Sequence, residues 1–262
     1  MAKERLDKVA VVTGTTRDVG EFLTYGLAQA GWDILGLYRN PKHTEQQEAM
    51  IKKIIKEYKV KMSAEASDLT NPDTPNLVID KLDKVFGGKV NALVLNASGG
   101  YKQTLEDARE INIVSQVRLV DQLLDRLVPG SVIVYNTSDP SHRFKQLVES
   151  EGANGDYYPV AKTKNEMENL LRLRVPEFLE RQIRLAVVVG NALDGTFVSR
   201  ALNHREKAFI DQWRSYTEEG YFPTAIDMAT ACLKVIRGNH PSGHTEYVGL
   251  KPEQQLYPAS KG

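Results

Sequence analysis

The sequence predicts an α/β protein built on a doubly wound parallel β-sheet of about seven strands flanked by helices. Short apolar runs rich in β-branched residues alternate along the chain with longer amphipathic stretches, the pattern of repeated βαβ units. Several runs, such as residues 92–95 and 185–189, are apolar at every position, as in strands that helices cover on both faces. No linker or internal repeat interrupts residues 1–262, so we expect a single domain.

The order of the elements follows from these runs and from the glycines and prolines between them. The expected strands are residues 9–13, 34–38, 60–66, 92–95, 131–135, 183–189 and 245–248. The expected helices are residues 21–30, 45–58, 74–85, 105–127, 160–180 and 225–237. Turn-forming residues at 31, 87–88 and 129–130 mark returns from helix to strand.

Two segments, residues 139–156 and 194–222, do not fit this repeat. Both follow the carboxyl end of an expected strand, the edge at which open α/β sheets bind ligands, so we expect substrate-loop insertions that wall a pocket. The candidate substrate contacts in them are Asp139, His142, Arg143, His204 and Trp213. The alternatives are a solvated first loop and a second loop packed on itself.

The amino-acid composition argues against several classes of binding partner. Lys and Arg total 34 and Asp and Glu total 34, a balance that argues against binding to nucleic acid. Cys232 is the single cysteine, and we expect it to be a buried apolar side chain instead of a disulfide or metal ligand. No stretch has the roughly 18 apolar residues of a membrane helix, and the first residues lack the apolar run of a signal peptide. We therefore expect no metal, no membrane and a cytoplasmic location.

A glycine-containing turn follows the first expected strand and leads into a helix. It reads Thr13-Gly14-Thr15-Thr16-Arg17-Asp18-Val19-Gly20. Gly14 suits a tight turn, Gly20 lets the helix approach the strand, and the first helical N–H groups suit a pyrophosphate. With Thr16, Arg17 and Val19, these residues are predicted to bind a dinucleotide. Taken alone, the two glycines would also fit an ordinary βα turn.

The end of the second strand indicates which dinucleotide. NAD-binding sites place an acid there for the ribose hydroxyls, whereas this chain has Arg39 and Asn40, with Arg17 in the preceding turn. Arginine suits a 2′-phosphate, and a charge-assisted pair contributes about 1.5 to 3 kcal/mol. The sequence therefore predicts NADP(H), preferred over NAD(H) by roughly tenfold to a hundredfold.

A tyrosine and a lysine carry the candidate chemistry. Ser138 ends the fifth strand, and Tyr158 and Lys162 follow on one face of an expected helix. A phenol has an ordinary pKa of about 10, so acid–base work near neutrality needs nearby positive charge, which a lysine one turn away supplies. Thr137 is an alternative to Ser138, whereas Tyr157 finds no lysine four residues on and is not assigned the proton transfer.

Taken in order, these motifs resemble the short-chain dehydrogenase/reductases over residues 6–250. The matching motifs are Gly14 with Gly20, Asp68-Leu69, Asn96-Ala97-Ser98-Gly99, Asn112, Ser138, Tyr158 with Lys162, and Val189-Gly190 followed by Thr196. The resemblance implies a single Rossmann-type domain, a small-molecule substrate, and assembly into a homodimer or homotetramer.

The resemblance also implies roles for individual residues. Tyr158 would transfer the proton, Ser138 would hydrogen-bond the reacting oxygen, Lys162 would lower the Tyr158 pKa and hold the nicotinamide ribose, and Asn112 would position a water. The implied cofactor contacts are Asp68 and Leu69 at the adenine, Asn96, Ala97 and Ser98 near the ribose, and Gly190, Ala192 and Thr196 along the nicotinamide.

The chain departs from the pattern of this family at several positions. Asp18 stands where a glycine is usual and places a carboxylate near the phosphates, with Arg17 beside it. Ser98 replaces another glycine, a change that also resembles the pteridine-reductase branch, and Val189 replaces a proline. The spacing from Asn96 to Asn112 is shorter than usual and that from Ser138 to Tyr158 is longer, which indicates a remodelled pocket.

These observations predict an NADP(H)-dependent oxidoreductase that interconverts a carbonyl and an alcohol by hydride transfer. Two alternatives stay open. One is a reductase of C=N or C=C bonds acting on pteridine-like substrates, which Ser98 favours. The other is a sensor that binds NADP(H) without turnover, although such sensors usually lack the tyrosine and lysine pair. The sequence does not identify the substrate.

Overall fold

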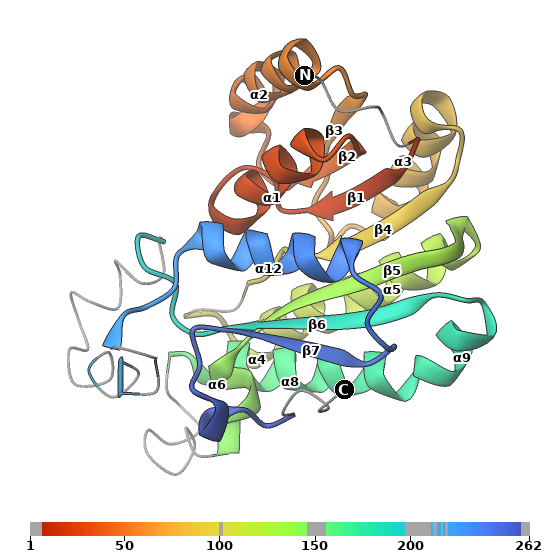
Figure 1. Ribbon diagram of the computed structural model, residues 1–262. Coiled ribbons are helices and arrows are strands. Elements are labelled where there is room, and N and C mark those ends of the chain that lie inside the picture. The colour runs from red at the N-terminus through yellow and green to blue at the C-terminus, as the bar shows by residue number, and fades with distance from the viewer. Residues whose placement is uncertain are drawn as a thin grey trace.

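The computed structural model describes residues 7–99, 102–145, 156–196, 211, 214–215, 217 and 220–257. In this part of the chain, parallel strands form one 7-stranded sheet in the order β3-β2-β1-β4-β5-β6-β7 (Figure 1). The strands are β1 Val9–Thr13, β2 Asp33–Tyr38, β3 Met62–Ala66, β4 Val90–Leu95, β5 Leu127–Ser138, β6 Arg184–Gly190 and β7 His244–Val248. The predicted doubly wound parallel sheet is confirmed.

Helices cover both faces of this sheet. Those described are α1 Asp18–Gln29, α2 Thr44–Tyr58, α3 Thr74–Lys81, α4 Leu105–Arg109, α5 Ser115–Leu123, α6 Asp139–His142, α8 Tyr158–Leu173, α9 Val175–Glu180 and α12 Ala225–Arg237. Wider π-helical turns extend α3 over Leu82–Phe86 and join α4 to α5 over Glu110–Val114. Short 3-10 turns lie at Pro41–His43, Leu124–Arg126 and Pro252–Gln254.

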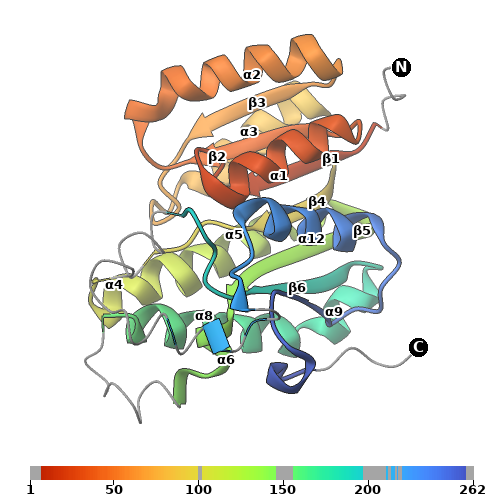
Figure 2. The ribbon, with the colours of Figure 1, turned by 60° about the vertical axis from the view of Figure 1, so that its left-hand side comes forward.

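The buried side chains form two apolar layers, one on each face of the sheet. Helices α1, α2 and α12 pack on the first face, with Leu23, Ile54 and Cys232 fully buried there. Helices α3, α5, α8 and α9 pack on the second. Helices α1 and α12 lie side by side in both views (Figures 1 and 2), where the Leu233 side chain fits against Gly26. The predicted burial of Cys232 is confirmed.

The structure corrects the expected elements at two places. The helix expected over residues 105–127 contains the π-helical turn and ends before β5, and the predicted return at 129–130 lies within β5. There the pairing passes from Val90 with Leu127 to Ala92 with Val132, so a bulge accommodates Pro129 and Gly130. The helix expected over 160–180 is divided into α8 and α9 because Pro176 lacks an N–H for a continuous helix.

The two expected insertions are described in part. The first begins with α6 immediately after Ser138. In the second, the Asp194 N–H donates to the Pro223 carbonyl oxygen at 2.8 Å, and this bond joins the start of the insertion to its end. His204 and Trp213 lie outside the described residues. Among the residues that are described, no helix is long and apolar enough to cross a bilayer.

A buried charged cluster connects α6, α8 and β7. The His142 Nε2 and Glu168 Oε2 atoms lie 2.8 Å apart, with side chains only 3% and 1% exposed. Arg172 donates through Nε to the other carboxylate oxygen of Glu168 at 2.9 Å, and through its terminal nitrogens to Gly243 O and Thr245 Oγ1. Burial raises the pKa of Glu168, but the hydrogen bonds and charges of His142 and Arg172 outweigh it and the net pKa is lowered.

We expect Glu168→Gln to lower the free energy of unfolding by about 2 to 4 kcal/mol, because Arg172 keeps a largely buried charge without its carboxylate. Since the pKa of Glu168 is lowered in the folded state, its stabilisation is present at neutral pH and lost as the pH falls through that value. Urea unfolding at pH 7 and pH 4 measures both effects. Glu48→Gln, at a carboxylate that is 59% exposed, is the control. An unchanged urea midpoint at pH 7 would contradict the prediction.

Candidate active site

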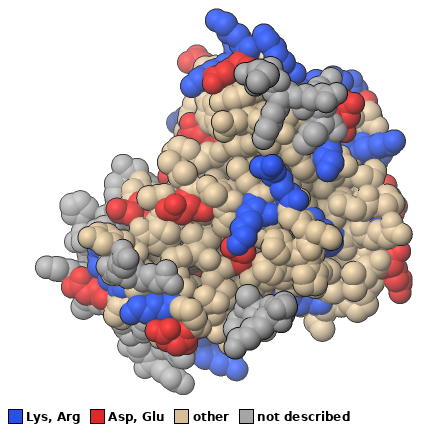
Figure 3. Space-filling view, viewed as in Figure 1, with Lys and Arg blue, Asp and Glu red and all other residues tan. Residues whose placement is uncertain are grey.

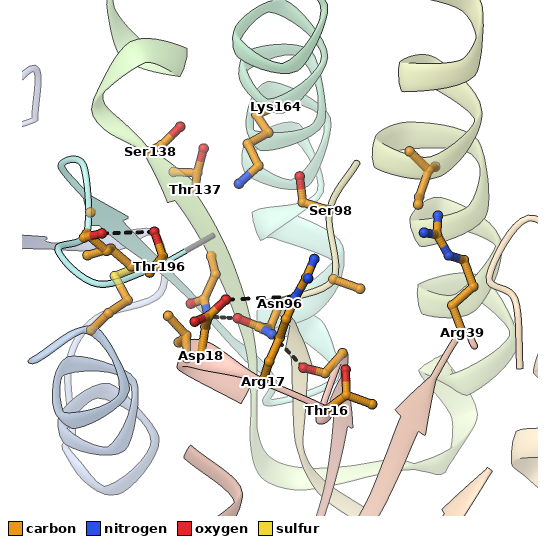
Figure 4. Close-up of a pocket in the computed structure, with 18 of the residues that line it drawn as sticks. Thr16, Arg17, Asp18, Arg39, Asn96, Ser98, Thr137, Ser138, Lys164 and Thr196 are labelled. Atoms are coloured by element: carbon orange, nitrogen blue, oxygen red, sulfur yellow. Dashed lines mark hydrogen bonds and ion pairs between the residues drawn. The ribbon is translucent and has the colours of Figure 1, made fainter. Parts of the chain in front are cut away.

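A cavity of about 500 Å³ lies at the carboxyl edge of the sheet, where β1, β4, β5 and β6 end (Figure 4). Its wall combines the turn after β1, the ends of these strands, the first half of α8 and Met228 from α12. This is the edge at which open α/β sheets bind ligands. Within the described part of the chain, no three His, Cys, Asp or Glu side chains gather in a way that would hold a metal ion.

The turn after β1 is held tightly against the sheet. The Gly14 N–H donates to Leu37 O at 2.8 Å, and Gly14 has a positive φ of 77°. A Cβ atom at Gly20 would collide with the Gly14 carbonyl oxygen, so only glycine lets α1 begin this close to the turn. Asp18, the first residue of α1, has a φ of 51° in the left-handed region, where a glycine would carry less strain. Its carboxylate lies 3.8 Å from Arg17 Nε.

A chain of amide hydrogen bonds fixes the floor of the cavity. Asn96 Nδ2 donates to the carbonyl oxygens of Thr13 and Gly14 at 3.0 and 3.2 Å, and Asn136 Nδ2 donates to Asn96 Oδ1 at 3.1 Å. The Cys232 thiol donates to Asn136 Oδ1 at 3.1 Å. Burial raises the pKa of this thiol to about 12, so Cys232 stays protonated and unreactive near neutrality.

Most predicted cofactor contacts line the cavity. They are Gly14, Thr16, Arg17, Val19, Arg39, Asn40, Asp68, Leu69, Asn96, Ala97, Ser98, Gly190, Ala192 and Thr196. Gly20 is not among the lining residues, because it supports the turn from behind. Asn40 also caps the 3-10 turn after β2, its Oδ1 accepting from Lys42 N at 3.0 Å. The structure therefore brings together most of the residues that the sequence predicted along a dinucleotide, Gly20 and Lys162 excepted.

The predicted catalytic residues divide into two groups. Ser138 lines the cavity, and its buried hydroxyl has no hydrogen-bond partner in the described structure. Asn112 lies behind the wall, where its side-chain oxygen accepts from Ser98 Oγ and Gly99 N and its Nδ2 donates to Thr163 Oγ1 at 2.9 Å. In this position Asn112 anchors α8 to the segment after β4 and does not face the cavity.

Tyr158 and Lys162 do not line the cavity, contrary to the sequence-based expectation. The Lys162 ammonium lies 5.8 Å from the centre of the Tyr158 ring and 3.9 Å from Glu166 Oε1. Glu166 also accepts a hydrogen bond from Arg109 of α4. The pair thus occupies the side of α8 that is directed toward α4. Their predicted roles in proton transfer and cofactor binding stay predictions.

The cavity instead receives Tyr157 and Lys164 from α8 and its start. These residues are seven positions apart, close to two helical turns, so they share a face. Lys164 is half-buried, and burial lowers the pKa of its ammonium from 10.5 to about 8. The sequence motif did not predict Lys164 as a cavity residue, because the motif pairs a tyrosine with a lysine four residues later. The seven-residue spacing between Tyr157 and Lys164 was the signal that could have predicted it.

The charged residues after Ser138 bind other protein groups. Arg143 Nε donates to Asp139 Oδ1 at 2.8 Å, and Arg143 also donates to the Gln254 carbonyl oxygen. Burial raises the pKa of Asp139, against the lowering effect of Arg143 and His142. Neither these three residues nor Ser141 lines the cavity, whereas Pro140 does. The first insertion therefore contributes an apolar contact at this point, and its charges stabilise the loop.

Comparisons with known proteins identify the family. The model of the short chain dehydrogenase family matches residues 8–146. General stress protein 39 of Bacillus subtilis (strain 168) is 30% identical over 140 residues, covering 50% of this chain and 48% of that protein. Farnesol dehydrogenase of Aedes aegypti is 26% identical over 212 residues, covering 72% of this chain and 82% of that protein. The chain belongs to the short chain dehydrogenases, a family of oxidoreductases.

A solved structure confirms the extent of the fold. L-sorbose reductase from Gluconobacter frateurii, complexed with NADPH and L-sorbose, superposes with a TM-score of 0.77. The match covers 98% of this chain and 100% of that one, at 18% sequence identity. At this identity the likeness establishes the fold alone.

We expect Lys164→Met to raise the free energy of unfolding at pH 7 by about 1 to 3 kcal/mol, because the ammonium is desolvated only in the folded protein. Burial lowers the pKa of Lys164 from 10.5 to about 8, so the wild type gains stability relative to the variant as the pH rises between these values. Urea unfolding at pH 7 and pH 10 measures this difference. Lys52→Met, at a side chain that is 80% exposed, is the matched control. Lower stability of Lys164→Met at pH 7 would contradict the prediction.

Proposed function

We propose that the chain is an NADP(H)-dependent oxidoreductase that interconverts a carbonyl and an alcohol by hydride transfer. The observation that carries the proposal is the composition of one cavity. Its wall includes the Gly14 turn and the amino end of α1 together with Ser138 and Lys164. A dinucleotide bound along this edge would bring its reactive ring toward groups that can hold and protonate an oxygen.

The residues present fit NADP(H). The turn after β1 suits a close approach by phosphate, since Gly14 lines the cavity together with Asp18 and Val19, the first two residues of α1. Arg39 lies at the end of β2, is exposed, and makes no ion pair with any described residue (Figure 4). Solved relatives hold either NADPH or NAD, so the choice of cofactor rests on Arg17 and Arg39 of this chain.

Different residues along the cavity have different proposed roles. Bound NADPH would supply the hydride. The Asn96 amide keeps the turn in place, and Leu69 and Asp68 would contact the adenine, with Asp68 Oδ1 accepting from Thr70 N at 3.0 Å. The Ser138 hydroxyl is buried and unpartnered among the described residues, so it can donate to the reacting oxygen. Ile111, Pro140 and Met228 give the wall of the cavity an apolar part.

We also propose that Tyr158 transfers the proton, assisted by Lys162 and by a water that Asn112 holds. The sequence motif supports this assignment. Reduction of C=N or C=C bonds is the second candidate function, because Ser98 lines the cavity at a position that resembles pteridine reductases. An assay with a pterin separates the two. A single-turnover measurement of hydride transfer separates both from a sensor that only binds NADP(H).

Assembly into a homodimer or homotetramer and a cytoplasmic location are further parts of the proposal. Apolar side chains are exposed on α8, with Leu173 at 78% and Leu170 at 40% exposed, and at Val114 in the turn before α5. This surface supports the proposed contact between copies of the chain. On the face shown in Figure 3, Lys and Arg side chains lie interspersed with Asp and Glu, a distribution that offers little field for a polyanion.

We expect NADPH to bind about tenfold to a hundredfold more tightly than NADH, because the 2′-phosphate gains a charge-assisted contact. Arg39→Ala is expected to remove about tenfold of the NADPH affinity and to leave NADH binding unchanged. Titrations that follow cofactor fluorescence measure all four affinities. Lys42→Ala, at an exposed charge nearby that does not line the cavity, is the control. Equal affinities of the wild type for the two cofactors would contradict the role of Arg39.

We expect Asp18→Gly to tighten NADPH binding by about tenfold, because a carboxylate close to the pyrophosphate is removed. The change also relieves the strain of a left-handed aspartate, about 1 kcal/mol, but it loses a similar stabilisation at the amino end of α1. Asp18→Asn removes the charge and keeps the strain, so the same titration separates the two causes. Weaker binding by both variants would show that the carboxylate assists the cofactor.

A further inference from the structure

We infer that His142 is a positioning residue for the proposed reaction, because it holds the short helix that carries Ser138 and Pro140 into the wall of the cavity. The inference rests on the proposed function, in which the Ser138 hydroxyl donates to the reacting oxygen. It gives a role to a residue that does not itself line the cavity. Ser138 ends β5 at the cavity (Figure 4), α6 follows directly, and His142 is the last residue of this four-residue helix.

Helix α6 is bound to Ser138 at its first turn. The Ser141 hydroxyl donates to the Ser138 carbonyl oxygen at 2.5 Å and lies 2.7 Å from the Thr137 hydroxyl. At a rise of about 1.5 Å per residue, His142 lies only roughly 6 Å along the chain axis from Ser138. A displacement of His142 would therefore also move Ser138 and Pro140, both of which line the cavity.

Both ring nitrogens of His142 contact other parts of the protein. Nε2 lies 2.8 Å from Glu168 Oε2 on α8, and Nδ1 lies 3.3 Å from the Tyr247 hydroxyl oxygen on β7. Helix α6 lies beside α8 in both ribbon views (Figures 1 and 2). Because the imidazole is buried and held at two atoms, it fixes the place of α6 relative to α8 and β7.

The segment after β7 holds the same end of α6. Tyr257 N donates to the Tyr247 hydroxyl at 2.9 Å, and the Tyr257 and His142 rings are perpendicular, with their centres 5.7 Å apart. Arg143, the residue after α6, donates to the Gln254 carbonyl oxygen at 3.0 Å. Two consecutive residues at the end of α6 are therefore bound to β7 and the segment that follows it.

The side chain of Ser138 depends on this support for its direction. Its backbone pairs with Gly190 of β6, and its buried hydroxyl has no hydrogen-bond partner among the described residues. In this part of the chain the hydroxyl is thus directed by the backbone of β5 and α6, so a shift of α6 changes where it points. Misplacing a catalytic group by about 1 Å can lower a rate by about 10²-fold.

The first test measures α6 without a substrate. Hydrogen–deuterium exchange of residues 138–143 is compared between the wild type and Tyr247→Phe, which removes only the hydroxyl that contacts His142 and Tyr257. Burial raises the pKa of Tyr247 to about 12, so this hydroxyl keeps its proton near neutrality. We expect exchange over residues 138–143 to become about tenfold faster, with residues 14–19 unchanged. Tyr58→Phe, at the end of α2, is the matched control. Unchanged exchange over residues 138–143 would overturn the inference.

The second test measures the NADPH-dependent reduction of a carbonyl panel: 4-nitrobenzaldehyde, 2,3-butanedione, ethyl acetoacetate and L-sorbose. His142→Gln keeps a donor for Glu168 but has no second nitrogen for Tyr247. We expect it to lower kcat by about tenfold to a hundredfold, and Tyr247→Phe to lower kcat by about threefold to tenfold. The affinity for NADPH should change by less than about twofold, because Asn96 holds the turn after β1. An unchanged kcat in both variants would overturn the inference.

A double-mutant cycle separates positioning from a general loss of stability. Ser138→Ala should lower kcat by about 10²-fold to 10³-fold. If His142 acts through Ser138, adding His142→Gln to this variant should cost less than about twofold more. Equal fold losses from His142→Gln in both backgrounds would overturn the inference alone. Circular dichroism verifies that each variant is folded. Absence of turnover by the wild type with all four carbonyls and with a pterin would overturn the proposed function, and this inference with it.

Discussion

The Asn96 side chain is the contact on which the rest of the cavity depends. Its amide nitrogen holds the Thr13 and Gly14 carbonyl oxygens, and its amide oxygen accepts from Asn136, so one residue joins the ends of β1, β4 and β5. The Thr13 hydroxyl completes the junction by accepting from the Asn96 and Ala97 N–H groups, both at 2.9 Å. Because these partners are all protein atoms, the turn after β1 is formed by the protein alone, so a ligand that bound there would lose less ordering entropy.

The fold could be predicted from the sequence because its signals are local. Runs such as Leu185 to Val189 are apolar at each position, which few structures other than a doubly covered strand accommodate. The turn after β1 could also be predicted. A side chain at Gly14 or Gly20 would be crowded by neighbouring elements of the same βα unit or the adjacent strand end, so both positions favour glycine. The bulge at Pro129 and Gly130 could not be predicted from the sequence, because it depends on the register between β4 and β5.

The rotation of α8 about its axis could not be predicted from the sequence either, because it also depends on long-range contacts. Tyr157 and Tyr158 are adjacent, so about 100° of helix rotation decides which one meets the cavity. Two long-range contacts set that rotation: Thr163 with Asn112, and Glu168 with His142. With both in place, Lys164 faces the cavity and Lys162 faces Glu166. The spacing of a motif identifies residues that share a face, but it does not say where the face points.

The buried cluster of His142, Glu168 and Arg172 extends to the C-terminal segment. The Arg172 guanidinium lies 4.3 Å from the centre of the Tyr257 ring, and Tyr257 N donates to the Tyr247 hydroxyl at 2.9 Å. The ends of β1, β4 and β5 are therefore joined by uncharged amides, whereas α6 and α8 are joined to the last strand by ion pairs and hydrogen bonds. A sequence change near the C-terminus would therefore disturb the packing of α6 and α8 on β7 first, while the amide contacts between β1, β4 and β5 keep their form.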